Sequence, residues 1–417
     1  MNRIIIIGNG FDLAHGLKTS YKDFIDWYWE KKILDLRNEK WDILDDGLTN
    51  FKLLQRNSWT CFYDDVWGNN IISKDRLFEY INNKPDFFEV RYQSFFNQIN
   101  KEYEKKGWVD IENEYYKLLI SSDNPEKLNN ELDIVKEKLI EYLKGIQNGT
   151  ETIDDLKPKI IEPIKKEDIA VGAYNTFINI INSRLEHNEE KSKGLVESYR
   201  DFYKYYKINH VFYYDIKKIS DFKTRIKRID SFEDLETKRC DLPEELLLPD
   251  RIMLLNFNYT DIADKYFSET TSNRFIVNHI HGKLDNPNEV IFGYGDEESE
   301  SFKELKERDN TEYTRNFKTI KYLEMPSYKK LLAFMESSPY QIYIMGHSCG
   351  KSDATLLNTM FEHPNCISIK PFYHQKEDGS DDNWDIVQNI YRNFKDLKLM
   401  RDRVVNKTQC EPMPQAE

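Results

Sequence analysis

Four polar residues of the sequence are of types that acid–base chemistry uses, and each stands in a predicted turn: Asp12, Asn258, His281 and Asp296. The unperturbed pKa of histidine, about 6.5, lies near working pH, so we expect His281 to act as a general base. The amide of Asn258 can hold a water molecule or a sugar hydroxyl, although asparagine also serves Asx turns and helix caps. A carboxylate favours a developing cation, which is the role that we expect of Asp12 or Asp296.

His279 stands two residues before His281, and the alternation of side chains along a strand would place both imidazoles on one face. Such a pair can ligate a metal ion, with Asp296 or His347 completing the ligand set. No tighter cluster of ligand residues surrounds the pair in the sequence. The pattern therefore favours an acid–base role for His281, and no metal is expected.

The first turn of the chain has the composition of a phosphate-binding turn. Four consecutive isoleucines, Ile4–Ile7, predict a buried strand, and Gly8-Asn9-Gly10-Phe11 joins it to an amphipathic helical pattern. Glycines let the backbone approach a phosphate, so we expect this turn to hold a nucleotide. The fingerprint G-x-G-x-x-G would need glycine at Leu13, so this is not the standard dinucleotide turn. A carboxylate repels phosphate, which leaves Asp12 to face a ribose hydroxyl, cap the helix or handle a proton.

A second glycine-containing turn, Gly346-His347-Ser348-Cys349-Gly350, is followed by Lys351 and Ser352. It has three residues between its glycines where a P-loop has four, which excludes the ATPase interpretation. The turn still precedes a helical pattern, with Ser352 or Asp353 as N-cap, and can contact a ligand. Cys349 with His347 is a further candidate nucleophile, although a half-buried thiol is the expected state.

The elements that must position these residues are strands that alternate with helices. After the first strand, further strands are predicted at Ile252–Leu255, Arg274–Gly282, Val290–Glu297, Gln341–Ser348, Cys366–Ile369 and, briefly, Leu397–Met400. Polar turns follow these strands, and the carboxyl ends of parallel strands meet at one edge of a sheet, where ligands bind. The pattern predicts an α/β fold, a mostly parallel Rossmann-like sheet with helices on both faces.

A large helical insertion interrupts this predicted core. Between Ile71 and about Glu245, apolar residues recur at helical spacing among many Lys and Glu residues, and glycine is scarce. We therefore expect residues 1–70 to form the first part of a nucleotide-binding core, 71–245 the insertion, 246–403 the second part of the core, and 404–417 a polar tail. Within the insertion, Asp110 and Glu114 are predicted to share a helix face, which composition alone assigns to solvent.

Composition limits the function classes. The chain has 417 residues and a formal net charge of −13, which argues against nonspecific binding to nucleic-acid phosphates. Its five cysteines form no C-x-x-C pair, so neither a disulfide framework nor a zinc knuckle is indicated. No apolar run approaches the roughly 20 residues that span a bilayer, and the short apolar run after Met1 is not expected to be a signal sequence. A soluble, cytoplasmic protein without membrane contact is expected.

The sequence resembles the AbiH-type bacteriophage abortive-infection family. The matching residues occur in order over nearly the whole chain: Gly8-Asn9-Gly10-Phe11-Asp12-Leu13, Trp108–Glu112, Asn256–Thr260, His279–Gly282, Phe292–Glu297, and Gly346-His347-Ser348 with Asp353. The resemblance implies a role in bacterial defence and does not fix a reaction. It also implies that Asp110 and Glu112 are more than a solvated acidic face.

The sequence is similar, more distantly, to sirtuin-like domains, among them defence proteins that hydrolyse NAD. The opening turn is followed by three motifs in the same order as in those domains: Asn258-Tyr259-Thr260, His281-Gly282, and Gly346-His347-Ser348 with Asp353. The sequence departs at Asp12, where serine is expected, and at Thr260, where aspartate is expected. It also lacks the four-cysteine zinc module, which argues against protein deacylation. The resemblance implies a sirtuin-like core that binds NAD through Gly8, Asn9, Gly10, Phe11, Tyr259, Gly282, Gly346, His347, Ser348 and Asp353.

Three hypotheses follow. In the first, the protein hydrolyses NAD or a related nucleotide, with the pyrophosphate at Gly8 and Gly10, and NAD depletion arrests an infected cell. In the second, it is a non-catalytic nucleotide sensor whose helical insertion contacts a defence partner or a second copy of the chain. In the third, it is a metal-dependent nuclease that uses His279, His281 and Asp296 with the acidic residues Asp110 and Glu112.

Overall fold

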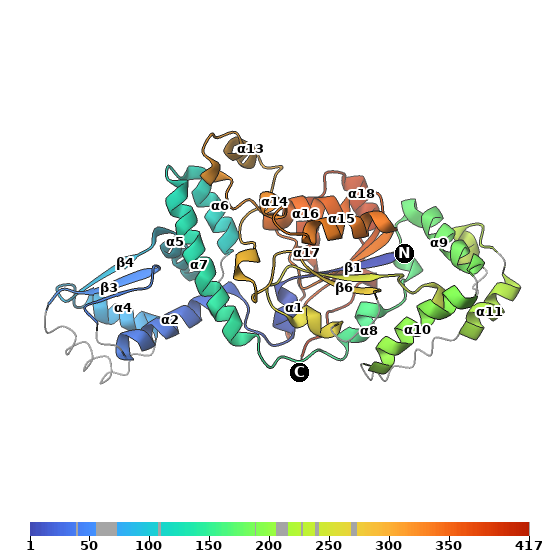
Figure 1. Ribbon diagram of the computed structural model, residues 1–417, viewed down its shortest axis with the longest axis horizontal. Coiled ribbons are helices and arrows are strands. Elements are labelled where there is room, and N and C mark those ends of the chain that lie inside the picture. The colour runs from blue at the N-terminus through green and yellow to red at the C-terminus, as the bar shows by residue number, and fades with distance from the viewer. Residues whose placement is uncertain are drawn as a thin grey trace. The chain divides into compact units, whose positions relative to one another are not determined.

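The computed structural model describes residues 1–38, 41–55, 73–106, 110–187, 189–205, 216–226, 228–237, 242–267 and 273–416. The chain forms two compact units (Figure 1). Unit 1 consists of Met1–Leu17, Gln147–Val290 and Lys321–Glu417, and unit 2 of Lys18–Ile146 and Ile291–Ile320. This division differs from the predicted one, because residues 147–245 of the expected insertion belong to unit 1.

A five-stranded parallel sheet forms the centre of unit 1. Its strands, in the order in which they pair, are β6 (Phe275–His279), β5 (Ile252–Asn256), β1 (Asn2–Ile7), β7 (Tyr340–Met345) and β8 (Cys366–Phe372). After β1, the chain adds β5 and β6 on one side of β1, and it then adds β7 and β8 on the other side. The connections that follow β1 and β7 therefore lead in opposite directions from these two adjacent strands. Such a switch point is where ligands bind in open α/β sheets.

Both faces of this sheet are covered, which explains why its strands are apolar throughout. On one face, Ile5, Ile7 and Leu254 share a hydrophobic cluster with residues of α8 (Leu156–Ile161) and α9 (Tyr174–Glu186). The opposite face is covered by other helices, and Figure 1 shows α8 on one side of the sheet and α15 and α16 on the other. These further helices contact β6 or β8: α15 (Ser327–Ser337), α16 (Ala354–Phe361), α17 (Asn383–Asn393) and α18 (Leu397–Arg403).

Two predicted strands and the predicted tail differ from the structure. The segment from Val290 to Glu297 forms no strand, and only an isolated bridge joins Tyr294 to Phe317. The expected last strand is part of helix α18. The expected polar tail pairs with the sheet, because Val404 and Pro412 form bridges to Ile369 and Tyr373 of the β8 region.

Unit 2 combines helices with a small antiparallel sheet. The sheet has the order β2 (Ile43–Asp45), β3 (Thr49–Leu53) and β4 (Phe88–Tyr92). Trp29 of α2 packs edge-on against Tyr28, and Tyr28 packs likewise against Phe96 of α5, so aromatic rings supply much of the core. The helices of unit 2 include α2 (Tyr21–Asn38), α4 (Lys74–Asn82), α5 (Ser94–Lys106), α6 (Ile111–Ser121), α7 (Pro125–Ile146) and α13 (Glu300–Lys306).

Candidate functional site

The turns that follow β1 and β7 pack directly against each other across the switch point. The backbone N–H of Gly10 donates to the carbonyl of Gly346 over 2.7 Å. A Cβ atom on Gly8 would lie 2.5 Å from the Cα of His347, and one on Gly346 would lie 2.0 Å from the nitrogen of Phe11. Gly346 also has φ of +73°, a conformation that side chains disfavour. The glycines that suggested a phosphate site are therefore required for contact between two turns.

The predicted phosphate-binding turn also uses its own N–H groups. The N–H of Gly8 donates to the carbonyl of Met345 over 3.2 Å, and the N–H of Phe11 donates to the carbonyl of Gly8 over 2.9 Å. Helix α1 (Asn9–Ala14), which the turn opens, has only six residues. Phe11 is fully buried and its ring packs against His15, so it belongs to the core, whereas Asn9 is exposed. The turn thus offers a phosphate fewer backbone donors than its sequence suggests.

Asp12 faces the next strand rather than a ligand. It is 2% exposed, and its two carboxyl oxygens accept hydrogen bonds from Asn258 Nδ2 at 2.7 Å and from Thr260 Oγ1 at 2.6 Å. Burial raises the pKa of Asp12 to about 7, although these two hydrogen bonds lower it. The side chain makes no capping bond at the start of α1, where Gly8 is the N-cap residue. Of the predicted roles, the structure is compatible with proton handling and adds a new one, the positioning of Asn258.

Asn258 is held by the turn after β1. Its Nδ2 donates to the carbonyl of Gly8 over 2.9 Å as well as to Asp12, and its backbone N–H donates to Asn256 Oδ1 over 3.0 Å. The amide of Asn256 also donates to the carbonyl of Thr260 over 3.2 Å, which closes the turn 256–260. Asn256 is fully buried, and its position inside a predicted polar turn was the only sequence signal for this role.

His281 lies just beyond β6 in a buried cluster of polar and aromatic groups. Its Nε2 is 3.3 Å from Oδ1 of Asp353 and 3.2 Å from the hydroxyl of Tyr322. The ring of Phe257 meets the His281 ring edge-on at 5.1 Å, and the half-buried ring of Tyr259 lies 6.5 Å from it. Asn258 therefore stands in the chain between two residues whose rings approach His281. Sequence reasoning missed Tyr322, for which no motif gave a signal.

The carboxylate of Asp353 lies between two imidazoles. Its second oxygen, Oδ2, is 3.6 Å from Nε2 of His347. The backbone N–H of Cys349 donates to Nδ1 of His347 over 3.0 Å, so Nε2 is the ring nitrogen that faces Asp353. Asp353 stands at the N-cap position of α16 but makes no capping hydrogen bond. The structure thus brings His281, His347 and Asp353 together, as the predicted sheet edge implied.

His279 does not share a face with His281, which corrects the prediction. Its Nε2 lies 2.9 Å from Oδ2 of Asp264, and its Nδ1 is 3.3 Å from the amide of Asn256. Although burial raises the pKa of Asp264, hydrogen bonds from His279 and Lys283 hold it below its ordinary value. The strand ends at His279, so the alternation of side chains does not extend to His281. In the described part of the chain, no three His, Cys, Asp or Glu side chains gather in a way that could hold a metal ion.

The turn after β7 is fixed by helix α17. Asn389 donates to the carbonyl of Ser348 and Asn393 to that of Cys349, each over 2.8 Å. Cys349 has φ of +54° and is 1% exposed, and burial raises the pKa of its thiol. A buried thiol with a raised pKa is a poor nucleophile, which disfavours that candidate role. Ser348 is exposed beside it.

Gly282 forms a tight turn behind His281. Its φ is +84°, and a Cβ atom there would lie 2.2 Å from the carbonyl oxygen of Glu289. The backbone of this turn therefore requires glycine at position 282, whether or not a ligand binds there.

The remaining predicted acidic residues lie in unit 2. Asp296 is buried there. Glu112 is also buried, where it pairs with Nζ of Lys318 at 2.9 Å and accepts the N–H of Gly293 over 3.1 Å. Asp110 caps α6 by accepting the N–H of Asn113 over 3.1 Å. These contacts give Asp110 and Glu112 structural roles, and Trp108 lies outside the described residues.

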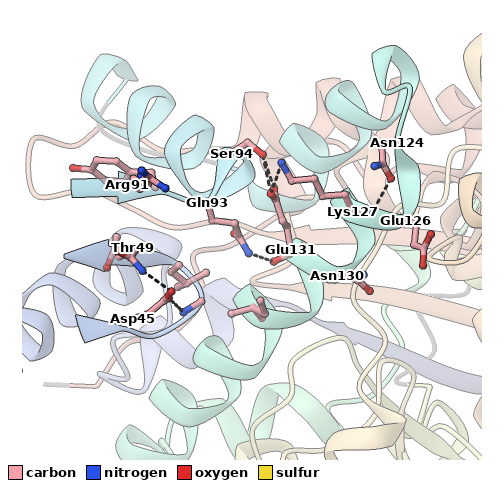
Figure 2. Close-up of a pocket in the computed structure, with 15 residues that line it drawn as sticks. Asp45, Thr49, Arg91, Gln93, Ser94, Asn124, Glu126, Lys127, Asn130 and Glu131 are labelled. Carbon is pink, nitrogen blue, oxygen red and sulfur yellow. Dashed lines mark hydrogen bonds and ion pairs between the residues drawn. The ribbon is translucent and has the colours of Figure 1, made fainter. Parts of the chain in front are cut away.

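Unit 2 also contains a cavity of about 660 Å³, lined mostly by residues of polar type, between the β2–β3 turn, the end of β4 and the start of α7 (Figure 2). Glu131 on its wall accepts hydrogen bonds from the Ser94 hydroxyl at 2.8 Å and the Phe95 N–H at 2.9 Å. No predicted site residue lines this cavity, so the sheet edge in unit 1 is the better candidate site.

Among the described helices, none is both long enough and apolar enough to cross a bilayer. The protein family described as bacteriophage abortive infection AbiH matches residues 4–374, a range that contains every residue of the candidate site. No curated protein and no solved structure matches the chain.

Proposed function

The chain belongs to the AbiH family of bacteriophage abortive infection, and we propose that within this response it hydrolyses NAD or a related nucleotide. The observation that carries the proposal is the position of His281. Its Nε2 lies within 3.3 Å of both the Asp353 carboxylate and the Tyr322 hydroxyl, at the sheet edge where Asn258 is also held. An imidazole oriented by a carboxylate is suited to take a proton from a hydroxyl or a water molecule.

In the proposed reaction, water adds to C1′ of the nicotinamide ribose as the bond from C1′ to the nicotinamide nitrogen breaks. Nicotinamide leaves with the bonding electron pair, and His281 accepts the proton that water loses. Asp353 stabilises the imidazolium that forms, and Asn258 orients the ribose or the water. Asp12 is proposed to act through Asn258, whose amide nitrogen lies 2.7 Å from the Asp12 carboxyl.

The test is to incubate the purified protein with NAD, with and without a chelator, and to separate the products by chromatography. We expect nicotinamide release that survives chelation, is lost in His281→Ala, and is strongly reduced in Asp353→Asn. The matched control is His363→Ala, because His363 belongs to unit 1 and pairs with Glu336, away from this cluster. Release that is unchanged in His281→Ala would refute the proposal.

A second arm covers a requirement for infection. Cells that express the protein are infected with phage, and their NAD content is followed with time. We expect NAD to fall in cells with the wild-type protein and not in cells with His281→Ala or Asn258→Ala. If those variants still protect cells, the site does not carry the defence function.

The other two hypotheses predict different results. A non-catalytic sensor would bind nucleotide without releasing nicotinamide and would change its assembly with a partner or a second copy. A metal-dependent nuclease would lose activity on chelation, and the residues proposed for it, His279 and His281, bond to different partners in the structure.

A further inference from the structure

We propose that Asp12 and Thr260 are positioning residues that fix the Asn258 amide with its oxygen toward the ligand. The site then selects a ligand by a sugar hydroxyl that donates to this oxygen. It gains little binding energy from phosphates at the Gly8–Gly10 turn. The proposal rests on the nucleotide-hydrolase function and deepens it. It names the recognised part of the substrate as the ribosyl group.

The orientation of the Asn258 amide follows from its partners. The carbonyl oxygen of Gly8 can only accept hydrogen bonds, so the atom that lies 2.9 Å from it must be the amide nitrogen. The same nitrogen donates its second proton to Oδ1 of Asp12 over 2.7 Å. Both amide protons are thus bonded within the protein, and Asn258 keeps only acceptor capacity, on Oδ1. The group that meets this oxygen must be a donor, such as a hydroxyl or water, because a phosphate dianion has no proton to give.

Thr260 completes the arrangement from the other side of Asp12. Its hydroxyl donates to Oδ2 of Asp12 over 2.6 Å, while Asn258 occupies Oδ1. Asp12 is therefore fixed at both oxygens, and it can rotate only by breaking one of these bonds. The fixed orientation of the Asn258 amide thus depends on Thr260, which acts on Asn258 through Asp12.

The same geometry disfavours phosphate recognition by the first turn. The N–H groups of Gly8, Gly10 and Phe11 donate to carbonyl oxygens of Met345, Gly346 and Gly8. The acidic side chain of Asp12 lies buried directly behind this turn, and a carboxylate repels a phosphate group. The turn consequently has little to offer the pyrophosphate of a dinucleotide.

The experiment measures binding to His281→Ala, which is not expected to consume the ligand. The probes are NAD, nicotinamide riboside, NAD analogues that lack the 2′- or the 3′-hydroxyl of the nicotinamide ribose, and inorganic pyrophosphate. We expect the riboside to bind within about tenfold of NAD, and at least one deoxy analogue to bind more than about tenfold more weakly, since a site built for a hydroxyl rejects the analogue that lacks it. Pyrophosphate should not compete with NAD.

The positioning role is tested by adding Thr260→Val, which keeps the side-chain shape and removes one donor. We expect the discrimination between NAD and the deoxy analogue to disappear, a readout that general loosening of the fold would not select. Thr359→Val is the matched control, because the Thr359 hydroxyl donates within its own helix to the carbonyl of Thr355 over 2.8 Å. If Thr260→Val folds poorly, Asp12→Ser serves as the second variant, since it shortens the bridge and is expected to erase the same discrimination.

The outcomes separate the two proposals. If NAD binds, pyrophosphate competes and the riboside does not bind, this inference is overturned and the hydrolase function stands. If Thr260→Val keeps full discrimination, the positioning role is overturned. If neither NAD nor the riboside binds, the proposed nucleotide function itself fails, and the inference fails with it.

Discussion

The amide nitrogen of Asn258 lies 2.7 Å from the carboxyl of Asp12, although 246 positions separate the two residues in the sequence. The contact exists because β1 and β5 are parallel neighbours whose last residues, Ile7 and Asn256, are in register. The turns that follow both strands therefore leave the sheet side by side. A contact built on backbone register is rigid, which suits a group that must present one atom to a ligand.

Asp12→Asn is expected to remove a contribution to stability that falls as the pH rises. Burial raises the pKa of Asp12 from 3.8 to about 7 on folding, so the folded state holds this proton more tightly than the unfolded chain. The contribution of Asp12 is fully present below pH 3.8 and is lost as the pH rises to about 7, by at most about 1.4 kcal/mol for each pH unit. Denaturant unfolding between pH 4 and 8 would show that the unfolding free energy of the variant falls less with rising pH, or rises more, than that of the wild type.

The control for this experiment is Asp264→Asn. The pKa of Asp264 is lowered on folding, so its contribution is present above pH 3.8 and is lost as the pH falls. The control should therefore lose stability at neutral pH and change the slope in the opposite direction. An Asp12→Asn variant with the wild-type slope would show that this carboxyl does not titrate in the stated range.

Gly346→Ala should destabilise the protein by at least about 2 kcal/mol. The alanine would have to adopt a positive φ, and its Cβ would overlap the backbone of the turn after β1. Gly194→Ala is the matched control, because Gly194 lies exposed within helix α10 (Glu189–Tyr205) and a Cβ there meets no atom within 4 Å. The control should be stabilised by about 0.5–1 kcal/mol. Thermal unfolding of both variants decides the matter, and equal behaviour would contradict the close packing of the two turns.

Tyr322→Phe should lower nicotinamide release by about tenfold, the effect of losing one hydrogen bond of about 1.4 kcal/mol to the imidazole. The Tyr322 hydroxyl lies 3.2 Å from Nε2 of His281 and helps to hold that ring. The ring of Tyr328 stacks on the ring of Tyr322, with 5.4 Å between their centroids. Tyr328→Phe removes the hydroxyl of this neighbouring ring and should leave the rate almost unchanged. Steady-state rates and their pH profiles provide the comparison, and equal rates for both variants would exclude a role for Tyr322 at His281.

Cys349 should resist alkylation in the folded protein. Its thiol is buried and its pKa is raised, so the reactive thiolate is scarce at pH 8. The half-buried Cys410, whose pKa is raised to about 11, should react slowly and before Cys349. Peptide mapping after iodoacetamide treatment, with and without urea, reports each site. Rapid labelling of Cys349 without urea would revive the nucleophile hypothesis.

Much of the core in unit 1 could be predicted from the sequence because parallel strands leave a strong local signal. The structure confirms the strands predicted at Ile4–Ile7, Ile252–Leu255 and near Gln341, as well as two others, in one parallel sheet. The segment from Val290 misled the prediction because its apolar run, Val290-Ile291-Phe292, resembles a short buried strand. There Gly293 instead approaches the carbonyl of Asn316 so closely that a Cβ would lie 2.0 Å from it.

The division of the chain could not be predicted because helical periodicity does not say which core a helix covers. The segment that contains α8 and α9 lies within the predicted helical insertion, as α7 does, yet its apolar face packs on the parallel sheet of unit 1. Which apolar faces meet is decided by complementary packing between segments far apart in the sequence.

The sequence by itself determined that the chain starts an α/β sheet at Ile4 and that polar turns gather at one edge of it, because buried β-branched runs and turn residues act locally. Tertiary structure decided what those turns do. In the folded chain the N–H groups of Gly10 and Phe11 donate to carbonyl oxygens, and the amide nitrogen of Asn258 donates to Asp12. His279 bonds to Asp264 and does not share the partners of His281. Hydrogen bonds are directional and pair whichever groups the register brings within about 3 Å, and residue types alone do not contain that register.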